Sequence, residues 1–292
     1  MATSGSTLAV DIGGTKLAVG RVDAAGLLGD RRSAPTPAQG GPEPMWELLA
    51  ELVAAVRQGD EQVVGVGCGG PMERDGRTVS PLNIPAWVRF PLHERLADLT
   101  GLPVHVDNDA KALALAEGWV GAARGVRDFV AMVVSTGVGG GIVLDGRLLD
   151  GAGGNAGHIG HVIVEPEGRV CGCGARGCLE AEASGTGIRA ATGVAPAEAG
   201  EDVRRRTGTL VGRAVASVAN LLDLGLAVVA GSVALGYGDT FFSAAQDELD
   251  ARSRIEFSRG ARIVPAGLGD AGPLVGAAAV GLRGEGHDVG IA

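Results

Sequence analysis

The sequence predicts an α/β protein built as two lobes, and three observations support this fold class. The chain has 292 residues, close to the size at which a single hydrophobic core stops growing, so one compact domain is the weaker alternative. Apolar segments typical of strands alternate with amphipathic segments typical of helices. Two strand–glycine turn–strand segments, at 8–22 and 129–149, are similar to each other, as expected of related lobes. We place the lobes at residues 1–112 and 113–292.

The expected elements follow in order along the chain. The first lobe begins with a hairpin whose second strand ends in a turn at Asp23–Gly26, and Gly59 is a plausible stop for the first helix. Its expected strands are the two strands of this hairpin, within 8–22, followed by 62–70 and 102–109, and its expected helices are 42–59, 93–101 and 110–121. In the second lobe we expect a hairpin over 129–149, helix 203–222, strand 227–234, a further helix, strand 261–267 and a last helix over 273–283. This last helix is expected to pack back on the first lobe.

Composition and charge exclude several classes of function. Hydrophobic residues make up 46% of the chain and charged residues 20%, which is typical of a globular protein. A formal charge of -9 argues against a broad nucleic-acid interface, because binding phosphates requires clustered cations. No apolar run approaches the roughly 18 residues that span a bilayer, and the N-terminal segment lacks the features of a signal peptide. We therefore expect a cytoplasmic protein with neither a membrane nor a nucleic acid as partner.

Two glycine-rich turns carry the residues expected at a phosphate site. Residues 11–16 read DIGGTK, so one hairpin tip holds a carboxylate, two glycines, a hydroxyl and an ammonium group. Glycines let backbone N–H groups approach a phosphate, and Asp11 could hold Mg²⁺ through water. Residues 135–141 read STGVGGG and repeat this chemistry. Either turn alone could be ordinary hairpin geometry, but the pair favours binding of a polyphosphate.

The segment VDNDA places Asp107, Asn108 and Asp109 where a strand leads into a helix, with no cation expected nearby to pair with the carboxylates. A carboxylate there could accept the proton of an alcohol during phosphoryl transfer, and an amide could orient that alcohol. The alternative is that Asn108 or Asp109 caps the helix. The local sequence alone favours the helix cap. Only the presence of the two glycine turns makes a catalytic role for this segment a comparable alternative.

Three cysteines crowd into one short segment together with histidines. Cys171, Cys173 and Cys178 follow His158 and His161, whereas Cys68 stands apart and is expected in the core. One imidazole and three thiolates would complete the closed tetrahedral shell of a structural zinc. Spacing alone allows either histidine to be the ligand. The segment 158–180 is therefore predicted to bind zinc, and its few cations argue against a nucleic-acid role.

With these motifs in place, the chain resembles the ROK family of bacterial sugar kinases and sugar-responsive repressors across nearly its whole length. DIGGTK and STGVGGG are similar to the family's two phosphate motifs, DND to its catalytic segment and CGCGARGCLE to its cysteine motif. AGSVA, at 230–234, resembles the segment near the base and ribose of the nucleotide. The resemblance implies the two-lobed actin-like ATPase fold, also called ribonuclease H-like, with the nucleotide bound between the lobes.

The resemblance also implies roles for individual residues and for ATP, Mg²⁺ and Zn²⁺. Asp109 is implied as the catalytic base, and His161, Cys171, Cys173 and Cys178 as the zinc ligands. The residues implied to bind the nucleotide and its phosphates are Asp11, Gly13, Gly14, Thr15, Lys16, Thr136, Gly137, Val138, Gly139, Gly140, Gly141, Gly231 and Ser232. Those implied to contact the sugar are Gly70, Asn83, Asn108, Asp109, His158, His161 and Glu180. His161 would then hold the metal through one nitrogen and a sugar hydroxyl through the other.

The implied activity is transfer of a phosphoryl group from ATP to the C6 hydroxyl of a hexose, by a homodimer. Position 158 departs from the glucokinase pattern G-E-x-G-H, because a histidine replaces the glutamate that accepts bonds from hydroxyls around C1 and C2. The segment G-H-I-G-H is similar to that of bacterial N-acetylmannosamine kinases, whereas NIPAW is similar to actinobacterial glucokinases. Both sugars therefore stay open. The alternative function is a catalytically weak sugar sensor, related to the repressors but without the DNA-binding segment that precedes their first phosphate motif.

Overall fold

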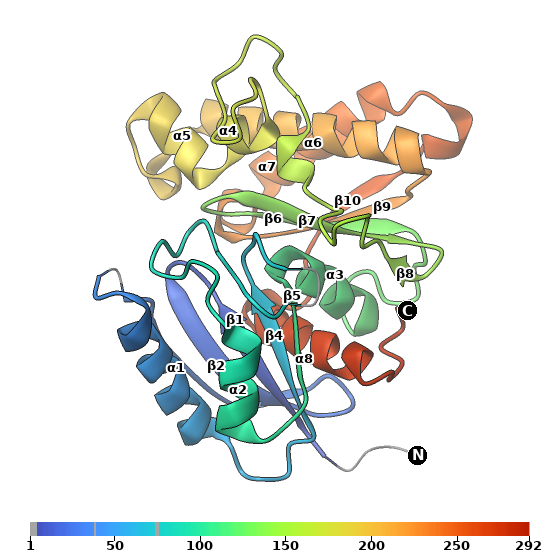
Figure 1. The fold of residues 1–292 in the computed structure, drawn as a ribbon. Helices are drawn as coiled ribbons and strands as arrows, with labels where there is room; N and C mark the ends of the chain where they lie inside the picture. The colour runs from blue at the N-terminus through green and yellow to red at the C-terminus, as the bar shows by residue number, and fades with distance from the viewer. Residues whose placement is uncertain (1–4, 38, 74–75, 292) are drawn as a thin grey trace. The chain divides into compact units, whose positions relative to one another are not determined.

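The computed structural model describes residues 5–37, 39–73 and 76–291, and the contacts within it divide the chain into two compact units (Figure 1). Unit 1 comprises residues 1–124 and 268–292, and unit 2 comprises residues 125–267. Both units contain a five-stranded sheet with helices, so the α/β class predicted from the sequence is confirmed. The lobe boundary that we placed at residue 112 stays a prediction.

The sheet of unit 1 runs in the order β3-β2-β1-β4-β5. β1 pairs antiparallel with β2, and β2 with β3, whereas β4 pairs parallel with both β1 and β5. The carboxyl ends of β1, β4 and β5 therefore meet at one edge of the sheet. The strands are β1 (Thr7–Ile12), β2 (Lys16–Val22), β3 (Leu28–Pro35), β4 (Val63–Cys68) and β5 (Val104–Asn108), and the helices are α1 (Pro42–Val56), α2 (Leu92–Thr100), α3 (Asp109–Trp119) and α8 (Gly272–Gly284).

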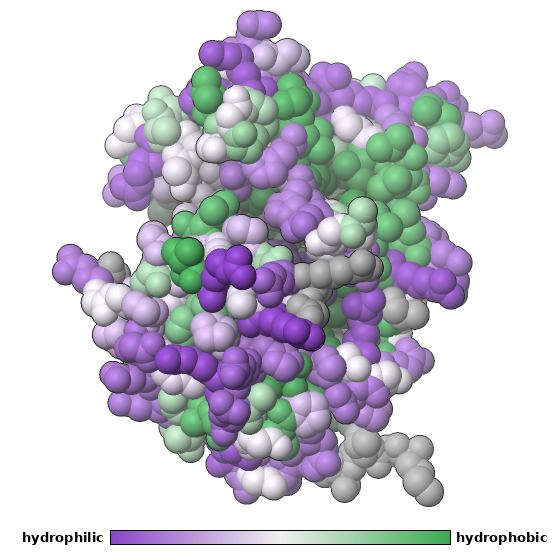
Figure 2. Space-filling model, in the orientation of Figure 1, coloured by the Kyte–Doolittle hydropathy of each residue, from purple (hydrophilic) through white to green (hydrophobic). Residues whose placement is uncertain are grey.

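Alternation along β1 assigns the two faces of this sheet. Leu8, Val10 and Ile12 join the apolar side chains of α1 and α2 in one buried core, whereas Ala9 packs with Leu274 of α8 on the opposite face. The outer surfaces of α1 and α2 are mostly hydrophilic (Figure 2). Small residues let α8 approach the sheet closely, since a Cβ at Gly65 of β4 would collide with the carbonyl oxygen of Ala277. Unit 1 therefore has three layers, with one sheet between two layers of helices.

Unit 2 repeats the same sheet topology with different strands. Its order β10-β9-β6-β7-β8 again joins two antiparallel pairings to two parallel ones. The side chains of α6 and α7 form one core with this sheet, and Gly208 and Gly212 of α6 lie against the backbone of α7. The strands are β6 (Phe129–Val134), β7 (Val138–Leu144), β8 (Arg147–Leu148), β9 (Leu226–Ala230) and β10 (Arg262–Pro265), and the helices are α4 (Leu179–Ala183), α5 (Gly185–Thr192), α6 (Glu201–Leu222) and α7 (Ser232–Arg252).

The structure differs from the sequence-based prediction at three places. β3 was not predicted, because LGDRRSAP is almost wholly exposed and shows no alternation of apolar residues. The short helices α4 and α5 were not predicted within and after the cysteine segment. The strand expected over 227–234 is too long, because it ends at Ala230 and α7 begins at Ser232. The turn at Asp23–Gly26 forms as predicted, with the Asp23 side chain accepting bonds from the N–H groups of Ala25 and Leu27.

Candidate functional site

The first glycine turn closes the hairpin between β1 and β2. The N–H of Gly13 donates to the carbonyl oxygen of Lys16 at 3.0 Å, and the Thr36 hydroxyl donates to the carbonyl oxygen of Gly13 at 2.6 Å. A Cβ added to Gly14 would lie 2.8 Å from the Cβ of Asn83. Glycine is therefore required where the turn passes the segment that carries Asn83.

Asp11 lies at the carboxyl end of β1, and Asp109 directly follows β5, with β4 between these two strands in the sheet. Asp11 pairs in register with Gly67 of β4, and Gly67 pairs with Asp107 of β5, two residues before Asp109. The pKa of Asp11 is raised to about 7, first by burial and then by the charge of Asp109, while Lys16 opposes the rise. The fold therefore places two acidic groups within electrostatic reach of each other, beside the first glycine turn.

Asn108 is the N-cap of α3, and Asp109 is the first residue of the helix. The N–H of Ala110 donates to the side-chain oxygen of Asn108 at 3.0 Å and to that of Asp109 at 2.8 Å. The capping interpretation is thus correct, and it also fixes the direction of the Asp109 carboxylate. The expectation that no cation pairs with this segment was wrong: Lys111 Nζ lies 3.2 Å from Asp107, because one helical turn brings position 111 back beside the strand end.

The sugar-contact candidates of unit 1 lie near the same turn. The N–H of Leu82 donates to the carbonyl oxygen of Gly70 at 3.1 Å, and a Cβ on Gly69 would lie 3.3 Å from the side-chain oxygen of Asn83. A Cβ on Gly70 would lie 3.8 Å from the Asn108 amide nitrogen. Gly70, Asn83, Asn108 and the cap of α3 are therefore local neighbours, although 38 positions of sequence separate Gly70 from Asn108.

A cavity of about 250 Å³ opens beside Asp11. Three cations line it, Lys16 of β2 and Arg31 and Arg32 of β3, together with Ser33 and Asp270. Within the described parts of the chain, none of these three cations forms an ion pair at 4 Å or less. Their charge suits a phosphate group. Sequence reasoning missed Arg31 and Arg32 because it did not predict β3, the strand that carries them next to the glycine turn.

The second glycine turn, in unit 2, is bonded to the two helices α4 and α5. The N–H of Gly185 donates to the carbonyl oxygen of Ser135 at 2.7 Å, and the N–H of Thr186 donates to that of Thr136 at 3.2 Å. The N–H of Val138 donates to the Glu180 carboxylate at 3.1 Å. The helices α4 and α5 therefore determine the shape of the turn.

Gly231 and Ser232 lie against the same turn. The hydroxyls of Ser135 and Ser232 are 3.0 Å apart, and Gly231 has a φ of 101°. A Cβ at Gly231 would overlap the carbonyl oxygen of Val134, so only glycine fits where β9 passes into α7. Thr136, Gly137, Gly231 and Ser232 are thus grouped around one turn. The residues Val138 to Gly141 belong instead to β7 and pair with β6, so the glycine turn expected over 135–141 is shorter than predicted.

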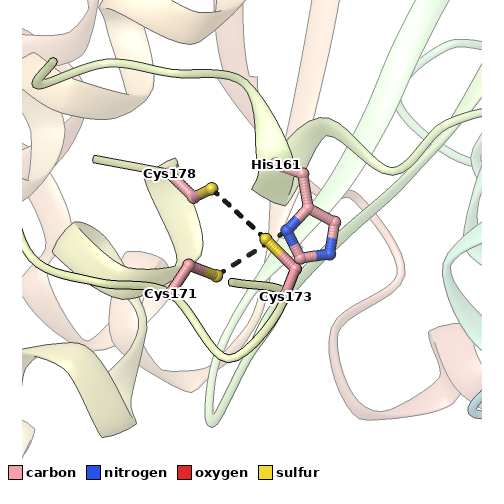
Figure 3. Close-up of side chains that lie close together, drawn as sticks. All are labelled: His161, Cys171, Cys173 and Cys178. Atoms are coloured by element: carbon pink, nitrogen blue, oxygen red, sulfur yellow. Dashed lines mark hydrogen bonds between the residues drawn. The ribbon is translucent and has the colours of Figure 1, made fainter. Parts of the chain in front are cut away.

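The three thiols converge with His161 (Figure 3). The four ligand atoms of His161, Cys171, Cys173 and Cys178 lie within 4.8 Å of one another. Cys173 Sγ is 3.7 Å from Cys178 Sγ, and Cys171 Sγ is 3.8 Å from His161 Nδ1. A tetrahedral zinc with Zn–S distances of about 2.3 Å requires sulfur atoms about 3.8 Å apart. The donor set and its spacing fit Zn²⁺.

Two thiols of this cluster have shifted acidities. A backbone hydrogen bond from Ala175, together with the neighbouring Cys171, lowers the pKa of Cys173. Burial and the neighbouring thiols raise the pKa of Cys178 to about 12. Metal binding requires thiolates, so a zinc ion must displace the proton of Cys178.

Two further sugar-contact candidates lie beside the thiol cluster. The rings of His158 and His161 are 6.0 Å apart, at the two ends of one 3₁₀ turn, and both residues are exposed. Nδ1 of His161 faces the thiols, so Nε2 points away from them (Figure 3). Glu180 follows Cys178 by two residues and bonds the second glycine turn. The thiol cluster, both histidines and the glycine turn therefore form one connected region of unit 2.

None of the described helices is both long and apolar enough to cross a membrane.

Comparison with known proteins gives consistent matches. The model of the ROK family matches residues 7–283. The N-acetylmannosamine kinase of Citrobacter koseri is 44% identical over 248 residues, covering 80% of this chain and 85% of that protein. The solved ROK hexokinase from Thermus thermophilus is 35% identical, with a TM-score of 0.80 over 96% of this chain and 99% of that chain.

A second solved structure carries ligands. The ROK family glucokinase from Streptomyces griseus, in complex with glucose and AMPPNP, is 31% identical, with a TM-score of 0.83 over 96% of this chain and 100% of that chain. Both the sequence and the fold therefore agree with the resemblance seen in the motifs. This chain belongs to the ROK family.

Proposed function

We propose that this protein is an ATP-dependent hexose kinase that phosphorylates the C6 hydroxyl of N-acetylmannosamine or glucose. The observation that carries the proposal is the assembly of Asp11, Asp109 and the first glycine turn at the carboxyl ends of β1 and β5. Relatives named N-acetylmannosamine kinase and glucokinase support it, and they favour turnover over a sensor. The roles of individual residues, the homodimer, the cytoplasmic location and the two lobe ranges stay predictions.

In the proposed reaction, Asp109 accepts the proton of the C6 hydroxyl while the oxygen attacks the γ-phosphorus of ATP. The bond from that phosphorus to the bridging β-oxygen breaks, and ADP leaves. Asp109 is exposed at the first position of α3, so its carboxylate can reach a bound hydroxyl. Gly70, Asn83 and Asn108 of unit 1, and His158, His161 and Glu180 of unit 2, are proposed to orient the sugar.

The phosphates are proposed to bind the backbone N–H groups and hydroxyls of both glycine turns. In unit 1 these are Gly13 to Lys16, joined by Arg31 and Arg32 of the adjacent cavity. In unit 2 they are Thr136 to Gly141, with Gly231 and Ser232 beside them. Mg²⁺, when bound, offsets the charge of the phosphates, and the Asp11 carboxylate is the hard oxygen ligand that would hold it.

Replacing Asp109 by asparagine tests the proposed base. Asn keeps the shape and the cap of α3 but cannot accept the proton, so kcat should fall by about 10²- to 10⁴-fold. A coupled assay of ADP release measures this, with calorimetric binding of sugar and AMPPNP as the control for an intact site. An undiminished kcat in a folded, ligand-binding Asp109→Asn variant would exclude Asp109 as the base.

The raised pKa of Asp11 predicts a stability that depends on pH. Between about pH 4 and 7 the folded protein keeps a proton that the unfolded chain has released, so its free energy of unfolding falls as the pH rises. Asp11→Asn removes the titrating carboxyl group and with it this pH dependence of the free energy of unfolding. In magnesium-free buffer it should stabilise the protein by about 1–3 kcal/mol at pH 8 and little at pH 4.

Urea denaturation at both pH values measures the difference, with no chelator present so that bound zinc stays in place. An Asp11→Asn variant no more stable than the parent at pH 8 would contradict the prediction. Because Asp11 is also the proposed magnesium ligand, the same variant should lose activity.

A structural zinc predicts close to one metal ion per chain by elemental analysis. Cys173→Ser should lose the metal and, because His161 is then no longer held, raise the KM for sugar about 10- to 100-fold. Cys68→Ala, which removes a buried thiol of unit 1, is the matched control and should keep the metal. Metal-free protein with full sugar affinity would refute the proposal.

The identity of the sugar is proposed to depend on position 158. His158→Glu replaces a ring that can donate and accept by an acceptor-only carboxylate. Relative to the parent, the ratio of kcat/KM for glucose to that for N-acetylmannosamine should rise about tenfold. One assay over glucose, mannose, N-acetylglucosamine and N-acetylmannosamine gives both the parent's substrate and the shift. An unchanged ratio would show that position 158 does not set the preference.

A further inference from the structure

Glu117, near the end of α3, is an acidic residue whose side chain is completely buried, at 0% exposure. A buried carboxylate is costly unless hydrogen bonds compensate its lost hydration. Sequence reasoning assigned it no role, since it is one polar residue in an apolar helix, and neither glycine turn nor the thiol cluster involves it. The hydrogen-bond partners of Glu117 therefore have to account for a carboxylate at this buried position.

The two carboxylate oxygens of Glu117 hold two segments that are far apart in the sequence. The N–H of Ala122 donates to Oε2 at 2.7 Å, and the N–H of Leu268 donates to Oε1 at 3.3 Å. Ala122 lies two residues before Arg124, where unit 1 gives way to unit 2, and Leu268 is the first residue after unit 2. Each passage of the chain between the units is thus bonded to one oxygen of the same side chain.

The backbone around Glu117 strengthens this anchor. Its carbonyl oxygen accepts the N–H groups of Gly121 at 3.2 Å and Ala123 at 2.9 Å. A Cβ at Gly121 would overlap the carboxylate, so glycine is needed for the chain to pass over it. On the other passage, Leu268 precedes α8, which packs tightly on α3 where Gly276 meets the backbone of Ala112. Glu117 is therefore attached to a rigid pair of helices.

We infer that Glu117 is a positioning residue that fixes the two segments through which the chain passes between unit 1 and unit 2. The inference rests on the proposed function for its catalytic consequence, because the proposed reaction uses Asp109 of unit 1 and the second glycine turn of unit 2. Phosphoryl transfer depends on placing these groups accurately. Loosening either passage should therefore slow the reaction even though Glu117 touches neither substrate.

Glutamine separates the two bonds. Its amide has the shape of the carboxylate but only one acceptor oxygen, so it can accept from Ala122 or from Leu268 but not from both. One part-buried N–H loses its partner, and that passage opens locally more often. Gly121→Ala should weaken the same hydrogen bonds while Glu117 is unchanged, because the added methyl group would displace the Glu117 carboxylate.

Glu61 provides a matched control within unit 1. It is also a buried carboxylate, at 4% exposure, and its two oxygens accept the N–H groups of Gln58 at 2.9 Å and Gly59 at 3.0 Å. These amides belong to the loop after α1, which joins two elements of unit 1. Glu61→Gln therefore removes one acceptor oxygen, and in addition the charge that pairs with Arg21 and Arg57, in a place that does not connect the units.

The experiment compares Glu117→Gln, Gly121→Ala, Glu61→Gln and the parent full-length protein by hydrogen exchange with mass spectrometry and by kinase assay. In Glu117→Gln and Gly121→Ala, peptides covering 120–128 and 265–270 should exchange about fivefold faster or more, and kcat should fall about tenfold. Glu61→Gln should speed exchange only around 57–62 and keep kcat within about twofold of the parent.

Unchanged exchange at 120–128 and 265–270 in both Glu117→Gln and Gly121→Ala would overturn the inference. A loss of kcat in Glu61→Gln as large as in these two variants would overturn it as well. Exchange is measured without substrates, so it tests the anchor even if the parent showed no kinase activity. A parent protein without kinase activity would reject the proposed function and leave the test of the anchor intact.

Discussion

The candidate site of unit 1 depends on holding Asp11 close to Asp109 despite their mutual repulsion. Asp11 is half-buried, and its pKa is raised to about 7, first by burial and then by the charge of Asp109. Parallel pairing of β1, β4 and β5 brings the acidic ends together, and the packing of α8 against Gly65 and of α1 against the opposite face keeps the strands in register. Binding a magnesium–phosphate group would relieve the repulsion, so a contact unfavourable for stability serves the proposed reaction.

In unit 2 the thiol cluster plays the corresponding role. The cysteine segment contains little regular structure besides single turns, so hydrophobic packing alone gives it few constraints. Zinc would supply the missing constraint, and Glu180 would transmit it to the second glycine turn through its bond to Val138. The metal is thereby linked both to the proposed sugar contact of His161 and to a proposed phosphate loop, so its loss should affect more than one substrate.

Buried carboxylates hold several loops of this protein in place. Glu61 bonds the loop after α1, Glu117 bonds both passages between the units, and Glu182 accepts the N–H of Arg169 at 2.6 Å in the cysteine segment. A carboxylate has two acceptor oxygens and no donor, so it can satisfy two backbone N–H groups at once. Such groups occur where a chain rich in glycine passes between regular elements and lacks backbone partners of its own.

The sequence by itself determined the elements and the chemistry that depend on local spacing. Apolar segments joined by glycine turns predicted both hairpins, and the crowded cysteines predicted a zinc ligand set from their spacing alone. What it could not determine involves partners far apart in the chain. Spacing left His158 and His161 equivalent, and only the fold turned Nδ1 of His161 toward the thiols. The cations of the exposed strand β3 and the hydrogen bonds of Glu117 to Ala122 and Leu268 likewise depend on tertiary contacts. Local patterns record which face of an element is buried, whereas the partner of a polar side chain is decided by which segments the packing brings beside it.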